Sequence, residues 1–240
     1  LAAKNTKVAK KNEKGLGVSS QELGEKKFLI IGNINCVTYK EVFPLIKTNR
    51  LWTGTRFNKR VNGKNMTFMV PDDYPMRGTE MYEESGKKFI SVAGTGWFTN
   101  LEHGRRHQPL QLMTVADNIK FSRHKDLRGK EYQKYDNYDA IEVPFTDAIP
   151  SDYDGVMGVP ISFLDKYCPE QFEILGMCEN EDLYCLKTRV YKREECQKAY
   201  FKKFNKKGTY DLNASGVLII DGIQEKVYQR ILIRHRRDKL

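Results

Sequence analysis

Short apolar runs, each ending at a glycine or a polar turn, form the basic pattern of this chain of 240 residues. The run FLIIG, residues 28–32, has the continuous apolar character of a strand buried on both faces. RLWTGTRF, residues 50–57, predicts a second strand. KKFISVAGTGWFTNL, residues 87–101, predicts a long strand whose glycines indicate a bulge or a close backbone approach.

The segment between the first two strands predicts a short helix. Thr38 is placed to cap it, and Glu41, three residues later, would complete a capping box. An apolar stripe follows at Val42, Phe43, Leu45 and Ile46. Further on, Asn62-Gly63 is typical of a hairpin turn. A strand, a helix and then hairpin-connected strands predict one edge of an α/β sheet with an antiparallel end.

The pattern changes after Asn100, where the chain becomes basic and rich in turns and tyrosines. We therefore place a domain boundary near residue 101. The elements expected beyond it are a helix-like FLDKY (163–167), a strand FEILG (172–176), a helix with apolar spacing at Cys196, Tyr200 and Phe204, and hairpin-like strands GVLIIDG (216–222) and KVYQRILIR (226–234).

Charge and composition narrow the class of protein. The net charge is +10 and the isoelectric point is about 9.2, which favours a polyanionic partner, nucleic acid first and a membrane surface second. No apolar run is long enough to cross a membrane, and the first 27 residues lack the apolar segment of a secretory signal. Five unpatterned cysteines are typical of a reduced, cytoplasmic protein. Residues 1–25, rich in lysine, predict a basic disordered arm.

Local motifs for catalysis or metal binding are weak. Gly94-x-Gly96 could approach a nucleotide, but a strand rather than a helix follows, so a bulge is favoured. His103 and His107 are four residues apart around two arginines, which would repel a metal ion, and we expect no metal site. A phosphate-contacting basic turn and a merely solvated loop both remain open for this segment.

Two cationic and aromatic stretches, residues 121–138 and 184–210, have the composition of a nucleic-acid surface. The alternative is a solvated helix face with a tyrosine-rich inner face, and both interpretations remain open. From the residues alone the chain is a basic α/β-plus-β protein with a candidate nucleic-acid face, and no enzyme is indicated.

Longer runs carry a more specific signal. They are KKFLIIGNIN (26–35), TYKEVFPLIK (38–47), WFTNL (97–101), YDNYDAIEV (135–143) and above all IPSDYDGVMGVPISFLDKYCPEQFEILG (149–176). In this order they closely resemble the EcoRI-type adenine-specific DNA methyltransferases, from about Lys26 to Arg237.

The resemblance implies transfer of a methyl group from S-adenosylmethionine to the N6 atom of adenine in duplex DNA, in a restriction-modification setting. It implies an α/β fold: a partial Rossmann-like S-adenosylmethionine methyltransferase sheet followed by a mixed α+β target-recognition region. Residues 26–100 would be the C-terminal part of the catalytic domain, with Phe28–Gly32 as a central strand. Residues 101–240 would be the target-recognition and DNA-binding region.

The resemblance also assigns candidate site residues. Asn33 and Asn35 would line the cleft that receives the flipped adenine. Trp97 or Phe98 would offer an aromatic face to the base, although plain packing on the sheet edge is slightly favoured for Trp97. The residues expected to contact DNA backbone or bases are Arg105, Arg106, Arg123, His124 and Lys125.

The sequence departs from the family at the catalytic turn, Asn-Pro-Pro-Phe. Its eight prolines all stand alone, and residues 1–27 contain none. We therefore expect this chain to be a C-terminal portion, with the cofactor-binding residues outside it and no catalytic residue assigned within it. It would be nearly inactive without an N-terminal half. The alternatives are a non-catalytic DNA-binding module, a basic RNA-binding protein and the unstable product of a decayed gene.

Overall fold

The computed structural model describes residues 26–56, 60–61, 64–65, 67–75, 81–91 and 94–236. The expected basic arm, residues 1–25, and the Asn62-Gly63 turn lie outside the described residues. The chain divides into two compact units, the first ending at Glu102 and the second beginning at His103.

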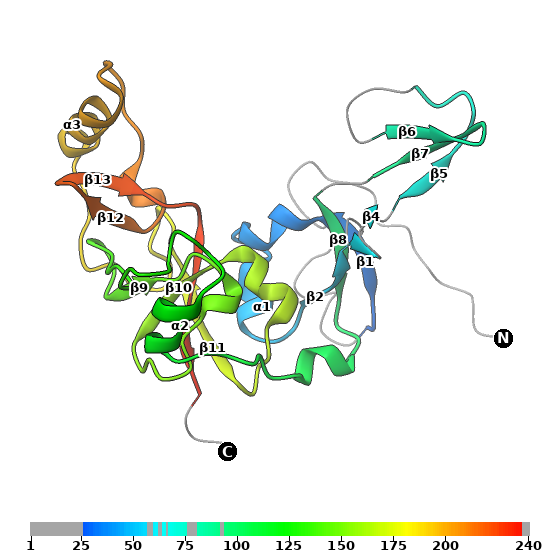
Figure 1. The fold of residues 1–240 in the computed structure, drawn as a ribbon, viewed down its shortest axis with the longest axis horizontal. Coiled ribbons are helices and arrows are strands. Elements are labelled where there is room, and N and C mark those ends of the chain that lie inside the picture. Colours follow the sequence, from blue (N-terminus) through cyan, green and yellow to red (C-terminus); the bar gives the residue numbers. More distant parts are fainter. Residues whose placement is uncertain are drawn as a thin grey trace. The chain divides into compact units, whose positions relative to one another are not determined.

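The main sheet of the first unit has three antiparallel strands in the order β1-β8-β2 (Figure 1). They are β1 (Leu29–Asn33), β8 (Thr95–Thr99) and β2 (Trp52–Arg56). The expectation that the first run is buried on both faces is wrong, because Leu29 and Ile31 are each 55% exposed. Among the described strands β1 pairs only with β8, so within this chain it lies at an edge of the three-stranded sheet, and its central place in a larger methyltransferase sheet stays a prediction.

A 3₁₀ turn and a short helix connect β1 to β2. They are η1 (Ile34–Thr38) and α1 (Phe43–Lys47). The expected capping box does not form, because α1 begins after Val42 and the Thr38 hydroxyl donates to the Asn35 carbonyl over 2.9 Å. The apolar stripe is confirmed as core: Val42, Phe43, Leu45 and Ile46 are all buried.

The expected long strand over residues 87–101 is two strands in two sheets. β7 (Lys87–Ile90) lies between β5 (Phe68–Val70) and β6 (Met81–Glu84), whereas β8 belongs to the main sheet. Gly94, between β7 and β8, has a φ of +67°, a conformation that glycine adopts without strain. A register shift does occur in this sheet, but the extra residue lies on β2, between Thr53 and Arg56, and not on the glycine-containing strand β8 for which the bulge was predicted. Further strands are β3 (Arg60–Val61) and β4 (Lys64–Asn65), which pair with each other.

The second unit is built on a four-stranded sheet in the order β11-β14-β10-β9. Its strands are β9 (Ala140–Glu142), β10 (Val156–Pro160), β11 (Phe172–Met177) and β14 (Arg230–His235). β9 runs parallel to β10, and β14 runs antiparallel to both of its neighbours. The apolar residues of β14 are almost completely buried, so this last strand is the centre of the unit.

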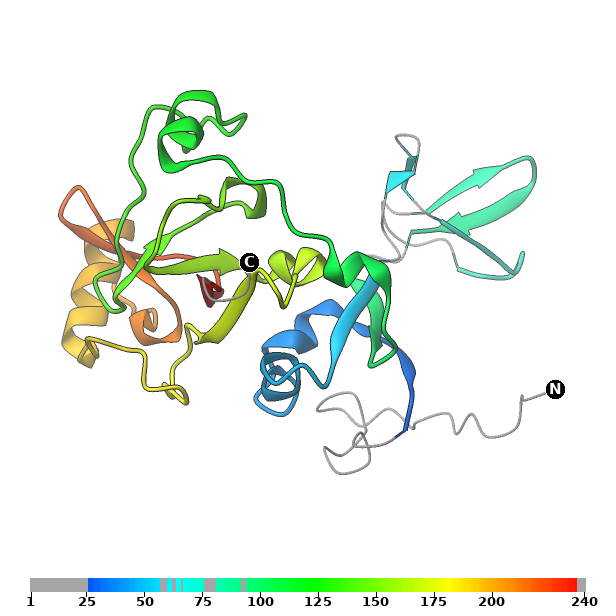
Figure 2. The same cartoon turned by 90° about the horizontal axis from the view of Figure 1, so that it is seen from below.

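The two apolar runs near the end of the chain, residues 216–222 and 226–234, do not form the expected hairpin with each other. β12 (Val217–Ile220) instead pairs with β13 (Ile223–Lys226) through a turn at Asp221 and Gly222, both of which have positive φ, as a type I′ turn requires. The helix α3 (Arg193–Phe204) packs against this hairpin, as Figures 1 and 2 show. The helical spacing read from Cys196, Tyr200 and Phe204 is confirmed.

The remaining elements are short. They are η2 (Gly104–His107), α2 (Val115–Phe121), η3 (Thr146–Ala148), η4 (Ile161–Lys166) and η5 (Leu212–Ala214), with η4 a 3₁₀ turn at the expected FLDKY helix. The described fold is thus mixed α/β with several small sheets and few helices. Within the described ranges, no helix has the length and apolar character needed to span a bilayer.

Candidate nucleic-acid interface

The residues expected to line a base-binding cleft have different surroundings in the first unit. Asn33 ends β1 and is exposed, and its side-chain oxygen accepts from the Asn35 backbone N–H over 2.9 Å. Asn35 is also exposed. Trp97 is half-buried, whereas Phe98 is 0% exposed. The assignment of Phe98 is therefore corrected, because a ring packed inside the sheet offers no face to a base.

The two arginines of η2 also differ in exposure. Arg105 is exposed, but Arg106 is buried at 6% exposure. The 3₁₀ turn causes this difference, because it points successive side chains in directions about 120° apart. Arg106 is thus removed from the DNA-contacting set, and Arg105 stays in it.

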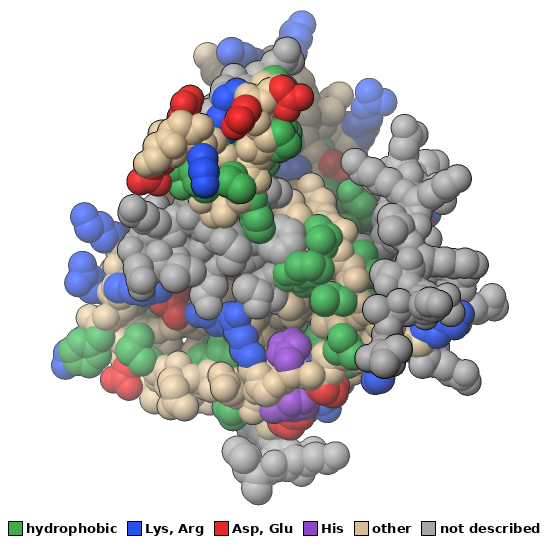
Figure 3. All heavy atoms as spheres, turned by 90° about the vertical axis from the view of Figure 1, so that its right-hand side faces the viewer, with side chains coloured by type: hydrophobic (Ala, Val, Ile, Leu, Met, Phe, Trp, Pro, Cys, Tyr) green, Lys and Arg blue, Asp and Glu red, His purple; other side chains and the backbone are tan. Residues whose placement is uncertain are grey.

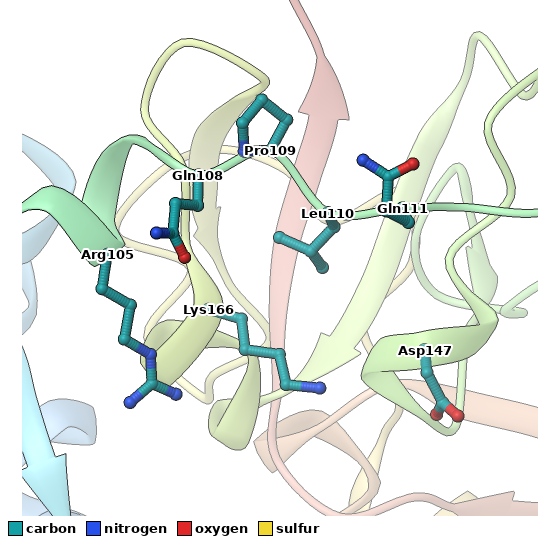
Figure 4. Close-up of a pocket in the computed structure, with 7 residues that line it drawn as sticks. All are labelled: Arg105, Gln108, Pro109, Leu110, Gln111, Asp147 and Lys166. Carbon is teal, nitrogen blue, oxygen red and sulfur yellow. The ribbon is translucent and has the colours of Figure 1, made fainter.

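Arg105 lines a hollow of about 310 Å³ in the second unit (Figure 4). The complete lining is Arg105, Gln108, Pro109, Leu110, Gln111, Asp147 and Lys166. In the view of Figure 4 the ammonium group of Lys166 lies between the Arg105 guanidinium and the Asp147 carboxylate. Two cations, two amides and one carboxylate thus face a single space.

Residues from another part of the sequence hold one wall of this hollow. The Gln171 side chain accepts from the Leu110 N–H over 2.7 Å and donates to the Leu110 carbonyl over 3.0 Å. His107 Nδ1 lies 2.8 Å from a carboxylate oxygen of Glu170. Burial alone would raise the pKa of Glu170, but the hydrogen bonds from His107 and from Cys168 lower it below its ordinary value. The segment from His107 to Leu110 is therefore fixed in place without using Arg105.

Asp147 links the hollow to the predicted basic residues of the loop after α2. Its carboxylate lies 2.9 Å from His124 Nε2 and 2.9 Å from an Arg123 guanidinium nitrogen. The His124 ring also stacks on Phe145, with ring centres 3.6 Å apart. Burial would raise the pKa of Asp147, but the hydrogen bond from His124, helped by the charge of Arg123, lowers it overall. Lys125, the residue after His124, is exposed.

The structure thus brings three of the five predicted DNA-contacting residues, Arg105, Arg123 and His124, to one carboxylate and its hollow. Sequence reasoning missed Asp147, Lys166 and Gln171. Lys166 and Gln171 lie in the family-specific run 149–176, but no spacing rule links them to a loop 61 residues earlier.

The chemistry of this hollow suits a polyanion. Arginine and lysine bind phosphate, and glutamine amides can bond to phosphate oxygens or base edges. Among the residues that the structure describes, no group of three His, Cys, Asp or Glu side chains could hold a metal ion. Figure 3 shows Lys and Arg side chains at several separate places on one face, so net charge by itself selects no surface. The fold and the hollow define a basic, mixed α/β protein with a candidate nucleic-acid interface.

The comparisons with known proteins agree on one family. The family model described as adenine-specific methyltransferase EcoRI matches residues 20–236. The chain is 47% identical over 159 residues to the Type II methyltransferase M.EcoRI of Escherichia coli, which covers 66% of this chain and 45% of that protein. It is 37% identical over 171 residues to the Type II methyltransferase M.MgeORF184P of Mycoplasma genitalium, covering 69% and 50%. No solved structure matches.

The chain therefore belongs to the EcoRI-type adenine-specific methyltransferase family. A third relative, the Type II methyltransferase M.MpnI of Mycoplasma pneumoniae, is 35% identical over 173 residues, covering 70% of this chain and 50% of that protein. The chain spans about half the length of the curated relatives it matches.

Proposed function

We propose that the chain forms the C-terminal portion of a site-specific DNA adenine-N6 methyltransferase of a restriction-modification type. The observation that carries the proposal is the family match over residues 20–236. Three relatives named Type II methyltransferases support it. The enzyme would transfer a methyl group from S-adenosylmethionine to adenine in duplex DNA.

We propose different roles for the two units. The first unit would complete a Rossmann-like catalytic sheet, with Asn33, Asn35 and Trp97 beside the flipped base. The flipped state is needed because N6 cannot be reached inside a stacked duplex. The second unit would be the target-recognition region, contacting DNA through Arg105, Lys166 and the Arg123–Asp147 cluster.

S-adenosylmethionine would be held by residues outside this chain. The hollow lined by Arg105, Lys166 and Asp147 does not fit it, because a lining of two cations and one carboxylate is net positive and disfavours the sulfonium and ammonium groups of the cofactor. The sequence also contains no Asn-Pro-Pro-Phe turn. We therefore expect negligible methyl transfer by this chain alone, and DNA binding as its own contribution.

A complementation assay tests the proposal. The purified chain is mixed with duplex DNA and S-adenosylmethionine labelled in the methyl group, with and without the separately made N-terminal half of the Escherichia coli relative. We expect no labelled adenine from the chain alone and labelled N6-methyladenine with the half added. Duplex binding without transfer in either mixture would point to a non-catalytic DNA-binding module. Turnover by the chain alone would contradict the assignment of catalytic residues outside it.

The role of Arg105 can be resolved within the same proposal. If its guanidinium contacts a phosphate, Arg105→Gln lowers the affinity for all duplex sequences and reduces the log–log salt slope by about 0.9. If it reads a guanine, the substitution costs about 1–3 kcal/mol and relaxes one base position. Arg106→Gln is not a suitable control because Arg106 is buried, whereas Arg128 is exposed and offers a matched substitution.

A further inference from the structure

A second cationic surface lies on α3, within residues 184–210, the second cationic and aromatic stretch of the sequence. The helix and the turn after it line a hollow of about 860 Å³. Its lining is Arg193, Glu194, Gln197, Lys198, Phe201, Lys202, Lys207, Gly208 and Thr209, here called the α3 face. None of these residues lines the hollow that contains Asp147.

The tyrosines near this helix are used for packing. Tyr200 packs against Phe204 and Tyr210, with ring centres 4.8 and 5.8 Å away. The Tyr210 hydroxyl donates to the Gln224 carbonyl on β13 over 2.5 Å. Cys196 and Ala199 complete this buried side of the helix. The tyrosine-rich inner face is therefore real, and the cations are left on the outside.

The outer side presents two rows of residues four apart. One row is Arg193, Gln197 and Phe201, and the other is Glu194, Lys198 and Lys202. Residues four apart on a helix lie about 6 Å from each other along one face. Phe201 is 53% exposed between the lysines, which places an apolar ring in a cationic hollow. Cations flanking an aromatic ring match a sugar–phosphate backbone, which alternates anionic phosphates with less polar sugars.

The lysines of the α3 face differ from neighbouring cations in their pairing. Lys203, on the inner side, pairs with Glu225 over 2.7 Å, and Arg189 pairs with Asp136 and Glu195. Within the described ranges, no salt bridge or hydrogen bond involves the side chains of Lys198, Lys202 or Lys207. Lys198 lies four residues after Glu194 and four before Lys202, so it is attracted by one neighbour on this face and repelled by the other.

The α3 face is also held in a fixed shape. At the start of α3 the Glu195 side chain accepts from the Lys192 backbone N–H over 2.8 Å. At its end Asn205 adopts the left-handed conformation, with a φ of +51°. Gly208 lets the following turn pass close to Tyr200, because a Cβ at this position would come within 2.5 Å of the ring. These contacts fix the backbone before binding, so only the side chains of the α3 face lose conformational freedom when a ligand binds.

We propose that the α3 face binds the sugar–phosphate backbone of duplex DNA, independently of sequence. This contact would be additional to the one at the hollow lined by Asp147. The proposal rests on the proposed function, which supplies duplex DNA as the partner. It adds that this surface fixes the position of the protein on DNA and carries no sequence information.

The salt dependence of DNA binding tests this proposal. The full chain is compared with Lys198→Gln/Lys202→Gln and with a control, Lys40→Gln/Lys87→Gln, which changes net charge equally at two exposed lysines of the first unit. Affinity for labelled duplexes of several sequences is measured by fluorescence anisotropy between 50 and 200 mM salt. Far-ultraviolet circular dichroism and the thermal midpoint check that each variant is folded.

We expect the α3 variant to bind all duplexes more weakly by the same factor, with a log–log salt slope shallower by about 1.8, or 0.9 for each lysine. The control should keep the slope of the unmodified chain. An unchanged slope in the α3 variant overturns the proposal, and leaves an acidic protein segment as the occupant to consider. A loss confined to one sequence also overturns it. If the unmodified chain binds no duplex, the proposed function itself fails, and this proposal falls with it.

Discussion

Two of the arginine–carboxylate clusters in the second unit differ strongly in burial. The side chains of Arg230 and Glu142 are 9% and 8% exposed, whereas those of Arg123 and Asp147 are 77% and 36% exposed. Water therefore screens the second pair and scarcely reaches the first. The comparison teaches that the first pair belongs to the scaffold and that the second can exchange its partner for a phosphate.

The buried cluster joins two strands on opposite sides of β10. Arg230 on β14 donates to both oxygens of Glu142 on β9, with nitrogen–oxygen distances of 2.6, 3.0 and 3.1 Å. The Tyr135 hydroxyl also donates to Glu142. Burial, and then the charge of Glu142, raise the pKa of Tyr135 well above its ordinary value, so the phenol stays neutral and remains a donor. Each charge is thus compensated within the protein.

The exposed cluster has the opposite property. Arg123 makes one contact to Asp147 and leaves most of its guanidinium in water. A DNA phosphate carries a full negative charge and could bind the same group without a large desolvation cost. The buried pair could not exchange partners in this way, because separating it would leave an unpaired charge in the core.

Breaking the buried pair should have the largest effect. Glu142→Ala leaves Arg230 buried without its carboxylate, and we expect a loss of about 3–5 kcal/mol in the free energy of unfolding. Urea denaturation followed by circular dichroism measures it. The double variant Glu142→Leu/Arg230→Met removes both charges and should be clearly more stable than Glu142→Ala. A loss below about 1 kcal/mol for the single variant would contradict the scaffold role.

A smaller effect is expected from crowding the same cluster. Tyr135 packs against Gly158 and Gly216, and a Cβ at Gly158 would clash with the tyrosine hydroxyl and lie 2.7 Å from the ring. Gly158→Ala should therefore displace the hydroxyl from Glu142 and destabilise the unit by about 1–3 kcal/mol. Gly104→Ala, where a Cβ would meet no neighbour and the backbone, as at Gly158, does not have a positive φ, controls for the general cost of replacing a glycine. Equal losses in the two variants would show that packing at Tyr135 is not responsible.

The sequence predicted local elements better than their places in the fold. The spacing of Cys196, Tyr200 and Phe204 identified α3, and FEILG identified β11, because periodicity is a local property. The similar apolar runs of β1 and β14 could not reveal that one lies at an edge and the other at the centre of a sheet. That difference depends on which strands pair, which is decided by residues far away in the chain.

The candidate site was predictable to a similar degree. Cationic character indicated Arg105, Arg123 and His124, but it also selected Arg106, which the 3₁₀ turn buries. Asp147 was missed because an isolated acidic residue carries no sequence signal. The hydrogen bonds from Gln171 to Leu110 cross 61 positions of the chain, and nothing in either segment indicates them.

Breaking the exposed pair should barely change stability but should change DNA binding. Arg123→Ala is expected to alter the free energy of unfolding by less than about 1 kcal/mol, since exposed ion pairs contribute little. The log–log salt slope of duplex binding should become shallower by about 0.9. Arg128→Ala, an exposed arginine a few residues later, is the matched control and should leave the slope unchanged. Loss of folding in Arg123→Ala would remove the distinction between the two clusters.

The smallest effect concerns the pH dependence of the exposed cluster. The pKa of Asp147 is lowered in the folded protein, so its charge contributes stability that is fully present above its unfolded pKa, about 3.9, and is lost as the pH falls through the lower folded value. Asp147→Asn cannot make this contribution. The unmodified chain should therefore be slightly more stable than Asp147→Asn at pH 7, and the difference should shrink below about pH 4. Urea midpoints of both proteins at several pH values between 7 and 3 measure this difference. Glu170 is present in both proteins, so the effect of its own titration cancels in the comparison. A stability difference that does not change with pH would mean that the Asp147 carboxylate is not stabilised by His124 and Arg123.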